Sequence, residues 1–405
     1  MIIGKFITKK NINLNLIFIN NHSLHYNFDV VIRYLVIISL SSVYMISCIG
    51  GHSFFRKANI ADHQFFSTAT IHKSDRSPFQ FCFSNTNIQS QLTRWKDTIS
   101  PKNKKLNWNE FMQQSHTVAF IVIRNDSILY ENYFNGMHRD SLIGVFSITK
   151  SIVGLLAGIA LDRGLIKELH EPIHYYIPSY SQDDRRYITW YHLLNMSSGF
   201  NFNDYENFGK IINLYYSDNL DNIITQVNMK FPAGLEFIYK SFDTQVLGYC
   251  LEKVYGESLT HVLQRELWQP LHTAHNAYWN LDRYLGTPKF FGGLNMCPID
   301  LAKIGKLMLQ EGQYDNKQVV SQSWISHCKN NEINKGKSYK YGYGWWKDIS
   351  PDPIIVKSSK DYYAAGLRGQ MLYICPEKNI IIIRQGTAKG GVNWYHKAQQ
   401  LTNLL

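Results

Sequence analysis

The sequence predicts an α+β fold, because strand patterns lie at both ends of the globular part and helical patterns lie between them. Residues 117–123 and 127–134 are β-rich apolar runs separated by an Asn-Asp turn signal, which is typical of a hairpin. Strand runs return at residues 370–375 and 380–384. This layout allows the first hairpin and the last strands to share one antiparallel sheet.

Helices are predicted in the middle of the chain. Residues 147–162 carry apolar side chains at helical spacing, and Gly164 ends the pattern. Further helical patterns cover residues 188–196, 220–229, 244–254 and 298–311. A strand at 341–346 and an amphipathic helix at about 393–405 complete the expected elements.

Composition excludes a disordered protein and gives no support to a nucleic-acid-binding one. Hydrophobic residues make up 45% of the 405 residues and aromatic residues 14%, so the chain can bury ample apolar surface and is not a disordered protein. The formal net charge is +11, but Lys and Arg are spread along the chain. Residues 1–47 contribute four basic side chains and one acidic one, so the remainder carries +8. This charge distribution gives no reason to expect nucleic-acid binding.

The N-terminal region resembles a targeting signal. Residues 30–49 are strongly apolar apart from Arg33, with an uninterrupted part as long as a signal-peptide core and short for a bilayer span. The residues directly before Cys48 resemble the lipobox of bacterial lipoprotein signals, although Met45 stands where that pattern usually has Leu. We expect residues 1–47 to be a signal segment and Cys48 to be lipidated, giving an exported, membrane-anchored lipoprotein of the periplasm or cell surface. The alternative is an uncleaved signal anchor.

The segment after this signal has little periodicity and is rich in Ser, Asn, His and Thr up to about residue 88. We therefore expect residues 48–104 to be a tether and residues 105–405 to be the catalytic domain. The five cysteines beyond Cys48 lie far apart and form no Cys-x-x-Cys pair. We expect buried free thiols rather than a disulfide framework or a zinc ribbon.

A serine and a lysine at the start of the 147–162 helix suggest nucleophilic catalysis. Ser147 and Lys150 are three residues apart and thus lie on one face of the helix. Unpaired N–H groups at the helix start could stabilise an oxyanion, and desolvation inside an apolar helix would lower the pKa of Lys150 towards that of a usable base. Tyr239 follows about 90 residues later, just before the next long helix, and can share a proton with both.

Several further motifs follow one another along the chain together with these residues. They are Ser147-x-x-Lys150-Ser151, Ile188 to Gly199, Tyr239-x-Ser241 followed by Asp243 to Gly248, Gly292-Gly293-Leu294 with Asp300-Leu301-Ala302, Tyr341 to Trp346, and Gly366 to Gln370. With them, roughly residues 105–400 resemble the serine β-lactamase and penicillin-binding-protein superfamily. The resemblance is to the branch that holds class C enzymes, esterases and 6-aminohexanoate-dimer hydrolases.

This resemblance implies an antiparallel sheet flanked by helices plus an all-helical lobe. Ser147 is similar to the family nucleophile, Lys150 to its base partner and Tyr239 to its proton-transferring tyrosine. Ser241 stands where lactamases have Asn, which is similar to the amide-hydrolase and esterase branch. The oxyanion hole would use the N–H of Ser147 and the strand at about Gly366-Leu367. No metal or organic cofactor is implied.

The strand of the third motif departs from the lactamase pattern. Lactamases and penicillin-binding proteins carry Lys-Thr-Gly or His-Thr-Gly there, whereas residues 362–366 read Tyr-Tyr-Ala-Ala-Gly. A penicillin carboxylate would lose a charge-assisted contact worth very roughly 1.5–3 kcal/mol. The pattern favours a small-amide or ester hydrolase over a β-lactamase, although Arg368 or Lys240 could supply a charge from elsewhere.

The sequence also contains one pattern that is typical of zinc proteases. Residues 170–174 read His-Glu-Pro-Ile-His, which matches the His-Glu-x-x-His motif of zinc proteases. That chemistry needs both histidines on one face of a continuous helix. Pro172 is tolerated only in the first turn of a helix, so His170 would lie outside it.

These observations predict an exported serine hydrolase that cleaves a small-molecule amide or ester through an acyl-enzyme on Ser147, tethered to a membrane and without nucleic acid as a partner. A β-lactamase or D-alanyl-D-alanine carboxypeptidase is the alternative within the superfamily. An alternative of another class is a lipoprotein that keeps the fold for binding or sensing without turnover. The filled positions Ser147, Lys150 and Tyr239 count against that last possibility.

Overall fold

The computed structural model describes residues 56–99, 104–205, 208–330, 339–348 and 360–405. The chain divides into two units, Met1–Lys57 and Ala58–Leu405, and the fold given below is that of the second. The predicted signal segment and Cys48 lie outside the described residues. Among the described helices, none combines the length and the apolarity needed to cross a bilayer.

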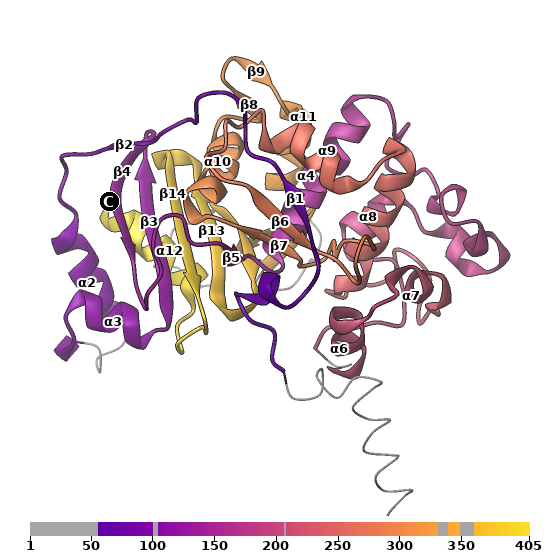
Figure 1. The fold of residues 1–405 in the computed structure, drawn as a ribbon, viewed down its shortest axis with the longest axis horizontal. Coiled ribbons are helices and arrows are strands. Elements are labelled where there is room, and N and C mark those ends of the chain that lie inside the picture. The colour runs from indigo at the N-terminus through magenta and orange to yellow at the C-terminus, as the bar shows by residue number, and fades with distance from the viewer. Residues whose placement is uncertain (1–55, 100–103, 206–207, 331–338, 349–359) are drawn as a thin grey trace, which may run out of the picture. The chain divides into compact units, whose positions relative to one another are not determined.

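The centre of the fold is a sheet of eight described strands (Figure 1). Its order is β10 (Tyr339–Gly342), β11 (Trp345–Asp348), β12 (Tyr362–Gly366), β13 (Gln370–Cys375), β14 (Ile380–Gly386), β3 (Thr117–Arg124), β4 (Ser127–Tyr133) and β2 (Cys82–Phe83). Neighbouring strands are antiparallel except β2 and β4. Ile382 pairs with Val122, so the first hairpin and the last strands share one sheet, as the sequence predicts.

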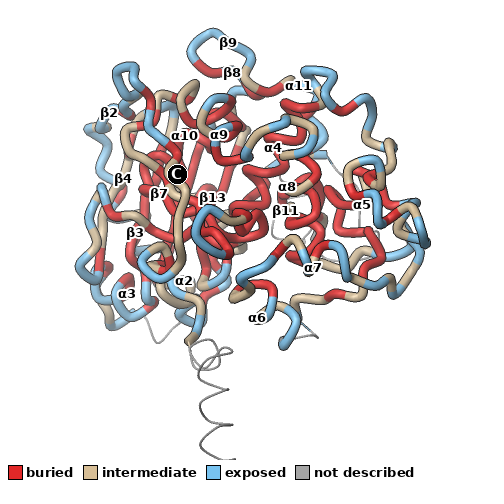
Figure 2. Tube along the Cα trace, turned by 45° about the vertical axis from the view of Figure 1, so that its right-hand side comes forward, coloured by how far each residue is buried: buried red, intermediate tan, exposed pale blue. Residues whose placement is uncertain are grey.

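Both faces of this sheet are buried, because alternate residues of its strands enter two different apolar cores. Ile381 and Ile383 of β14 belong to the larger core, whereas Ile380 and Ile382 belong to the smaller one. On the larger-core side, α4 (Ile148–Asp162) and α10 (Pro298–Leu309) pack against β12, β13 and β14. On the other side lie α2 (Gln89–Ile99), α3 (Trp108–Gln114) and α12 (Trp394–Leu404). Figure 2 shows the buried strands and the buried α4 and α8 between exposed loops.

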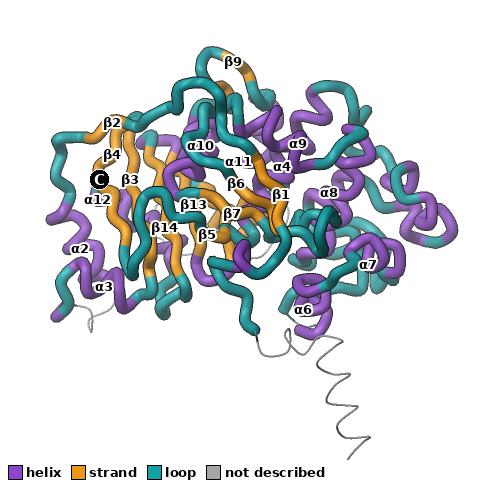
Figure 3. Tube along the Cα trace, in the orientation of Figure 1, coloured by secondary structure: helices purple, strands orange, loops and turns teal. Residues whose placement is uncertain are grey.

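A helical lobe follows α4 in the chain and adjoins it through α8 (Figure 3). Its helices are α5 (Trp190–Leu194), α6 (Phe208–Tyr216), α7 (Leu220–Gln226), α8 (Ser241–Tyr255) and α9 (Leu259–Leu263). Gly256 ends α8 in the left-handed conformation at φ 70°, a backbone shape that glycine adopts without strain. The remaining described helix, α11 (Gln322–Asn330), lies outside this run. The α+β fold class with a helical lobe is thus confirmed.

Two smaller sheets complete the fold and correct the expected tether. One has the order β1 (Thr68–Ile71), β6 (Ala277–Asn280), β7 (Leu294–Met296) and β5 (Ile143–Gly144), and the other pairs β8 (Gln313–Tyr314) with β9 (Lys317–Gln318). The strand β1 pairs with β6, and the side chains of Ile60, Ile71 and Phe81 are buried in the larger core. Residues 58–99 are therefore part of the folded unit rather than a tether.

The strand expected at 341–346 is also different. It is a hairpin of β10 and β11, because Tyr343 and Gly344 both have positive φ, of 53° and 92°, and turn the chain back. A Cβ at Gly344 would lie 2.6 Å from Cα of Ser151, so the turn sits directly on α4. The Ser151 hydroxyl donates to the Gly344 carbonyl at 2.6 Å and fixes the contact.

Candidate active site

Ser147 lies at the junction of β5 and α4, as the N-cap residue of α4. The residue before it, Phe146, has φ 48°, a left-handed conformation that is costly for a bulky side chain and typical of functional turns. The main-chain N–H of Ser147 donates to no other residue in the part of the chain that the structure describes. It is therefore available to a substrate.

Lys150 lies one turn into α4, buried, with its amine at the centre of a hydrogen-bond cluster. Nζ donates to Ser147 Oγ at 2.7 Å, to the Phe291 carbonyl at 2.8 Å and to Ser241 Oγ at 3.1 Å. A neutral amine has two N–H bonds and one lone pair. With Phe291 and Ser241 as its acceptors, the lone pair would point at Ser147 Oγ, which is the arrangement a general base needs.

The environment of Lys150 favours its neutral form. Burial lowers the pKa of this ammonium group to about 8, and the negative charge of Asp204 partly opposes that effect. A substantial fraction of Lys150 is therefore neutral in mildly alkaline solution. The lowered pKa of Lys150 agrees with the expectation from its place in an apolar helix.

Tyr239 approaches Ser147 from the loop before α8. Burial and the nearby Tyr341 and Asp204 raise the pKa of its hydroxyl well above the ordinary value, and a hydrogen bond to the Ser147 side chain acts in the opposite direction. Its ring also covers the Lys150 amine, 5.2 Å from the ring centroid. The structure thus brings Ser147, Lys150, Tyr239 and Ser241 together from two segments of the chain, residues 147–150 and 239–241.

Asp204 is a member of this cluster that the sequence did not indicate. Its Oδ1 accepts from the Ser241 N–H at 2.7 Å, and its Oδ2 accepts from Ser241 Oγ at 2.6 Å. Because the single hydroxyl proton of Ser241 is directed at Asp204, Ser241 Oγ can act only as an acceptor towards Lys150. No local pattern marks Asp204, since it lies in a loop 37 residues before its partner.

The expected oxyanion strand is β12, and its end lies beside the segment that leads into Ser147. A Cβ at Gly366 would lie 2.4 Å from the Val145 carbonyl, two residues before Ser147, so only glycine allows the strand this close. Leu367 follows at the start of a 3₁₀ turn and is 54% exposed. The N–H groups of Ser147 and Leu367 thus belong to segments that meet.

Aromatic side chains form a wall beside Tyr239. Its ring centroid lies 5.1 Å from that of Trp346 and 5.5 Å from that of Tyr341, while Tyr205 lies 6.3 Å away and is largely exposed. A substrate at Ser147 would therefore meet an apolar surface on the side of β10 and β11.

The two cations that could replace the missing lysine of the third motif are committed elsewhere. Lys240 is fully buried, with Nζ 3.6 Å from Asp243 Oδ2 and within 3.3 Å of the Met196 and Ile238 carbonyls. Arg368 donates to the carbonyls of Ala58 and Thr387. The Lys240 ammonium group and the Arg368 guanidinium group would each have to break these contacts to bind a substrate carboxylate.

The His-Glu-x-x-His segment does not form a zinc-protease helix. Pro172 is extended at ψ 136°, and only Ile173–Tyr175 form a 3₁₀ turn. His170 stacks against Tyr191 instead, while His174 Nδ1 lies 3.0 Å from the Arg186 carbonyl. The structure therefore agrees with the argument from Pro172 that the two histidines do not share one helix face.

The family model described as Beta-lactamase matches residues 97–393. The chain belongs to the β-lactamase family. A 6-aminohexanoate-dimer hydrolase from Paenarthrobacter ureafaciens is 24% identical over 295 residues, which cover 67% of this chain and 73% of that protein. As a member of this family with a hydrolase as a homologue, the chain is a serine hydrolase.

Two solved structures share the fold. A Bacillus anthracis protein provisionally described as a 6-aminohexanoate-dimer hydrolase superposes with a TM-score of 0.70 at 21% identity, covering 84% of this chain and 90% of its own. EstCE1, described as a hydrolase with promiscuous acyltransferase activity, gives a TM-score of 0.62 at 14% identity, covering 78% of this chain and 98% of its own. These likenesses bear on the fold, and the substrate has to be argued from the site.

Proposed function

We propose that this protein is an exported serine hydrolase that cleaves an amide or ester through an acyl-enzyme on Ser147. The observation that carries the proposal is the cluster around Lys150, whose amine lies 2.7 Å from Ser147 Oγ and whose other two partners are acceptors. Tyr239, which is hydrogen-bonded to the Ser147 side chain, adds a proton donor at the same hydroxyl.

In the first half of the reaction, neutral Lys150 takes the Ser147 proton as Oγ bonds to the carbonyl carbon of the substrate. The negative charge that develops on the carbonyl oxygen is stabilised by the N–H groups of Ser147 and Leu367. Tyr239 then gives its proton to the leaving nitrogen or oxygen as that bond breaks, and Lys150 returns a proton to Tyr239. The raised pKa of Tyr239 suits this role, because its hydroxyl stays protonated at neutral pH.

In the second half, water attacks the carbonyl carbon of the ester on Ser147. The same two groups remove the proton of the water and return one to Ser147 Oγ, which leaves as the ester bond breaks. The carboxylic acid product departs, and Ser147, Lys150 and Tyr239 regain their starting protonation states. Every proton is thus accounted for by the chain and water.

The substrate class follows from what β12 lacks. Its residues Tyr362 to Gly366 include no cation, and Lys240 and Arg368 are held by other partners. A penicillin carboxylate would lack a charge-assisted contact, at a cost of about 1.5–3 kcal/mol. Linear amides and esters do not need that contact. The similarity to a 6-aminohexanoate-dimer hydrolase points in the same direction.

Export and membrane anchoring rest on the N-terminal sequence alone. The apolar run before Cys48 supports lipidation at that cysteine, and an uncleaved anchor is the other reading of the same run. Intact mass of the mature N-terminus tests this part. A diacylated Cys48 at the mature N-terminus would support lipidation, and a chain that still begins at Met1 with Cys48 unmodified would contradict lipidation and favour the uncleaved anchor.

An active-site probe tests the catalytic part. We expect a fluorophosphonate to add one adduct to the full chain, none to Ser147→Ala, and one to the exposed control Ser90→Ala. An equal adduct on Ser147→Ala, or none on the wild type, would overturn the enzyme proposal in favour of a binding or sensing protein. The rates of hydrolysis of p-nitrophenyl esters, linear amide oligomers and nitrocefin are then compared to decide whether the enzyme is an esterase, an amidase or a β-lactamase. Fast nitrocefin hydrolysis would favour a β-lactamase instead.

A further inference from the structure

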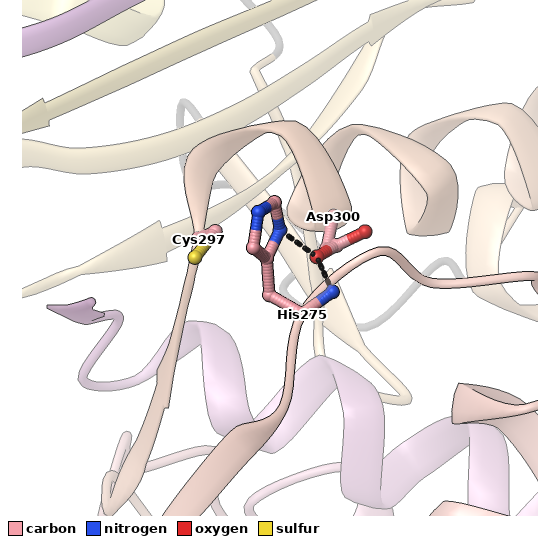
Figure 4. Close-up of side chains that lie close together, drawn as sticks. All are labelled: His275, Cys297 and Asp300. Carbon is pink, nitrogen blue, oxygen red and sulfur yellow. Dashed lines mark hydrogen bonds and ion pairs between the residues drawn. The ribbon is translucent and has the colours of Figure 1, made fainter. Parts of the chain in front are cut away.

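A second cluster of reactive side chains lies outside the catalytic site, where β7 leads into α10 (Figure 4). Cys297 is the residue before α10, Asp300 lies in its first turn, and His275 comes from the segment before β6. One candidate ligand atom from each of these three residues lies within 4.8 Å of the other two. None of them takes part in the mechanism above.

Asp300 orients the histidine of this cluster. Its Oδ2 accepts from the backbone N–H of His275 at 3.0 Å and lies 2.8 Å from His275 Nδ1, while its Oδ1 accepts from Ala274 N–H and from Lys303 Nζ at 2.8 and 2.9 Å. Asp300 therefore has four partners and no free lone pair for a metal. The contact fixes the ring with Nδ1 towards Asp300 and leaves Nε2 facing away, which is how a carboxylate presents a histidine to a metal ion.

A thiol and a second carboxylate meet this free face of His275. Asp140 Oδ1 lies 3.1 Å from Nε2, and the Cys297 thiol is hydrogen-bonded to the His275 side chain. Sγ of Cys297 also donates to the main-chain carbonyl oxygen of Asp140 at 3.4 Å, so Cys297 and Asp140 are direct neighbours. Cys297 is buried, but Asp140 is 67% exposed, which leaves a path for an ion from solvent.

We propose that His275 Nε2, Cys297 Sγ and Asp140 Oδ1 bind one Zn²⁺ ion, with Asp300 as the outer carboxylate and a water as the fourth ligand. Nitrogen, thiolate and carboxylate donors are the ligands that zinc accepts in four-coordinate sites. Bonds of about 2.0–2.1 Å would place nitrogen and oxygen ligands about 3.3 Å apart, close to the 3.1 Å found. Binding replaces the Cys297 S–H bond with an S–Zn bond and the His275 Nε2–H bond with an N–Zn bond, and it releases both protons to solvent.

The position of the site gives the ion a structural role. Asp140 lies three residues before β5, which pairs with β7 through Ile143 and Met296 and leads into Ser147. A metal ion that joins Asp140 to Cys297 would close this pair of strands at one end. It would therefore stabilise the segment that carries the nucleophile without contacting the substrate.

The test uses the full chain stripped of metal with a chelator and titrated with Co²⁺ as a spectroscopic substitute for Zn²⁺. We expect one Co²⁺ per chain, a thiolate-to-cobalt charge-transfer band, and loss of that band when Zn²⁺ is added. Cys297→Ser should abolish the band, whereas Cys82→Ser, which alters an exposed cysteine on β2, should keep it. Asp140→Ala alters an exposed residue and should weaken Zn²⁺ binding about tenfold or more.

A thermal melt gives a readout that does not depend on the cysteine variants. Zn²⁺ at a hundredfold excess over its wild-type Kd should raise the Tm of the wild type by roughly 3–6 °C and that of Asp140→Ala by at most about half as much. The proposal is overturned if the wild type binds no metal, if Cys297→Ser keeps the band, or if Asp140→Ala binds Zn²⁺ as tightly as the wild type. None of these readouts requires hydrolytic activity.

Discussion

The Ser241 hydroxyl donates to Asp204 Oδ2 at 2.6 Å while accepting from Lys150 Nζ at 3.1 Å. This polarity matters because Ser241 has only one proton to give. With that proton directed at Asp204, Lys150 must use an N–H bond towards Ser241 and keeps its lone pair for Ser147. In the proposed mechanism Asp204 would therefore control the direction of the base, although it makes no described hydrogen bond to Ser147.

Replacing Asp204 with asparagine tests this polarity. In Asp204→Asn the amide would donate to Ser241 Oγ, which would turn the Ser241 proton towards Lys150 and occupy its lone pair. We expect the maximal kcat to fall roughly 10- to 100-fold, at or below the low end of what a general base contributes. The loss of the negative charge should also lower the pH midpoint of activity, because Asp204 raises the pKa of Lys150. Asp184→Asn, an exposed aspartate, is the control, and an unchanged midpoint in Asp204→Asn would contradict the polarity argument.

The lowered pKa of Lys150 gives a pH dependence of defined sign. The base must be neutral, so kcat/KM should rise with pH and level off above a midpoint of about 8. Rates for a p-nitrophenyl ester between about pH 6 and pH 10 measure this midpoint. Lys150→Arg should remove the rise together with the activity, because arginine remains charged, whereas the exposed Lys253→Arg should keep both. Activity that falls with rising pH would contradict a neutral lysine as the base.

Gly366 should be intolerant of any side chain. A Cβ there would meet the Val145 carbonyl at 2.4 Å, so Gly366→Ala must push β12 away from the segment that carries Ser147. Misplacing the oxyanion donor at Leu367 should lower kcat about 100-fold or more. Gly209→Ala on α6 meets no atom within 4 Å and serves as the matched control. Equal kcat values for the two variants would remove Leu367 from the proposed oxyanion hole.

The elements that the sequence predicted are those whose pattern is local. The β3–β4 hairpin has alternating apolar runs around a turn, and α4 has apolar residues at helical spacing up to Gly164, so each carries its own signal. The strand β1 was missed because it is short, and its partner β6 lies about two hundred residues later. Its Ile71 becomes buried only through that distant pairing.

The same distinction holds for the candidate site. Ser147, Lys150 and Tyr239 were predicted because they stand in motifs at fixed spacing. Asp204, in contrast, gains its role from a contact with Ser241 across a loop. The cluster of Asp140, His275 and Cys297 joins three segments in the same way, so no spacing rule for zinc ligands would have identified it.

Arg384 supplies a last prediction, since this buried guanidinium holds the turn that follows Leu367. It donates to the carbonyls of Arg368 and Gly369 at 2.8 and 3.1 Å, and to those of Ser115 and Ala388 at 2.8 Å. Lysine has fewer and less spread donors, so Arg384→Lys should leave buried carbonyls unpaired and lower the free energy of unfolding by about 3 kcal/mol. Urea denaturation measures this loss, with the exposed Arg94→Lys as control. If both variants unfold at the same urea concentration, the turn is held by its own backbone and Arg384 is dispensable.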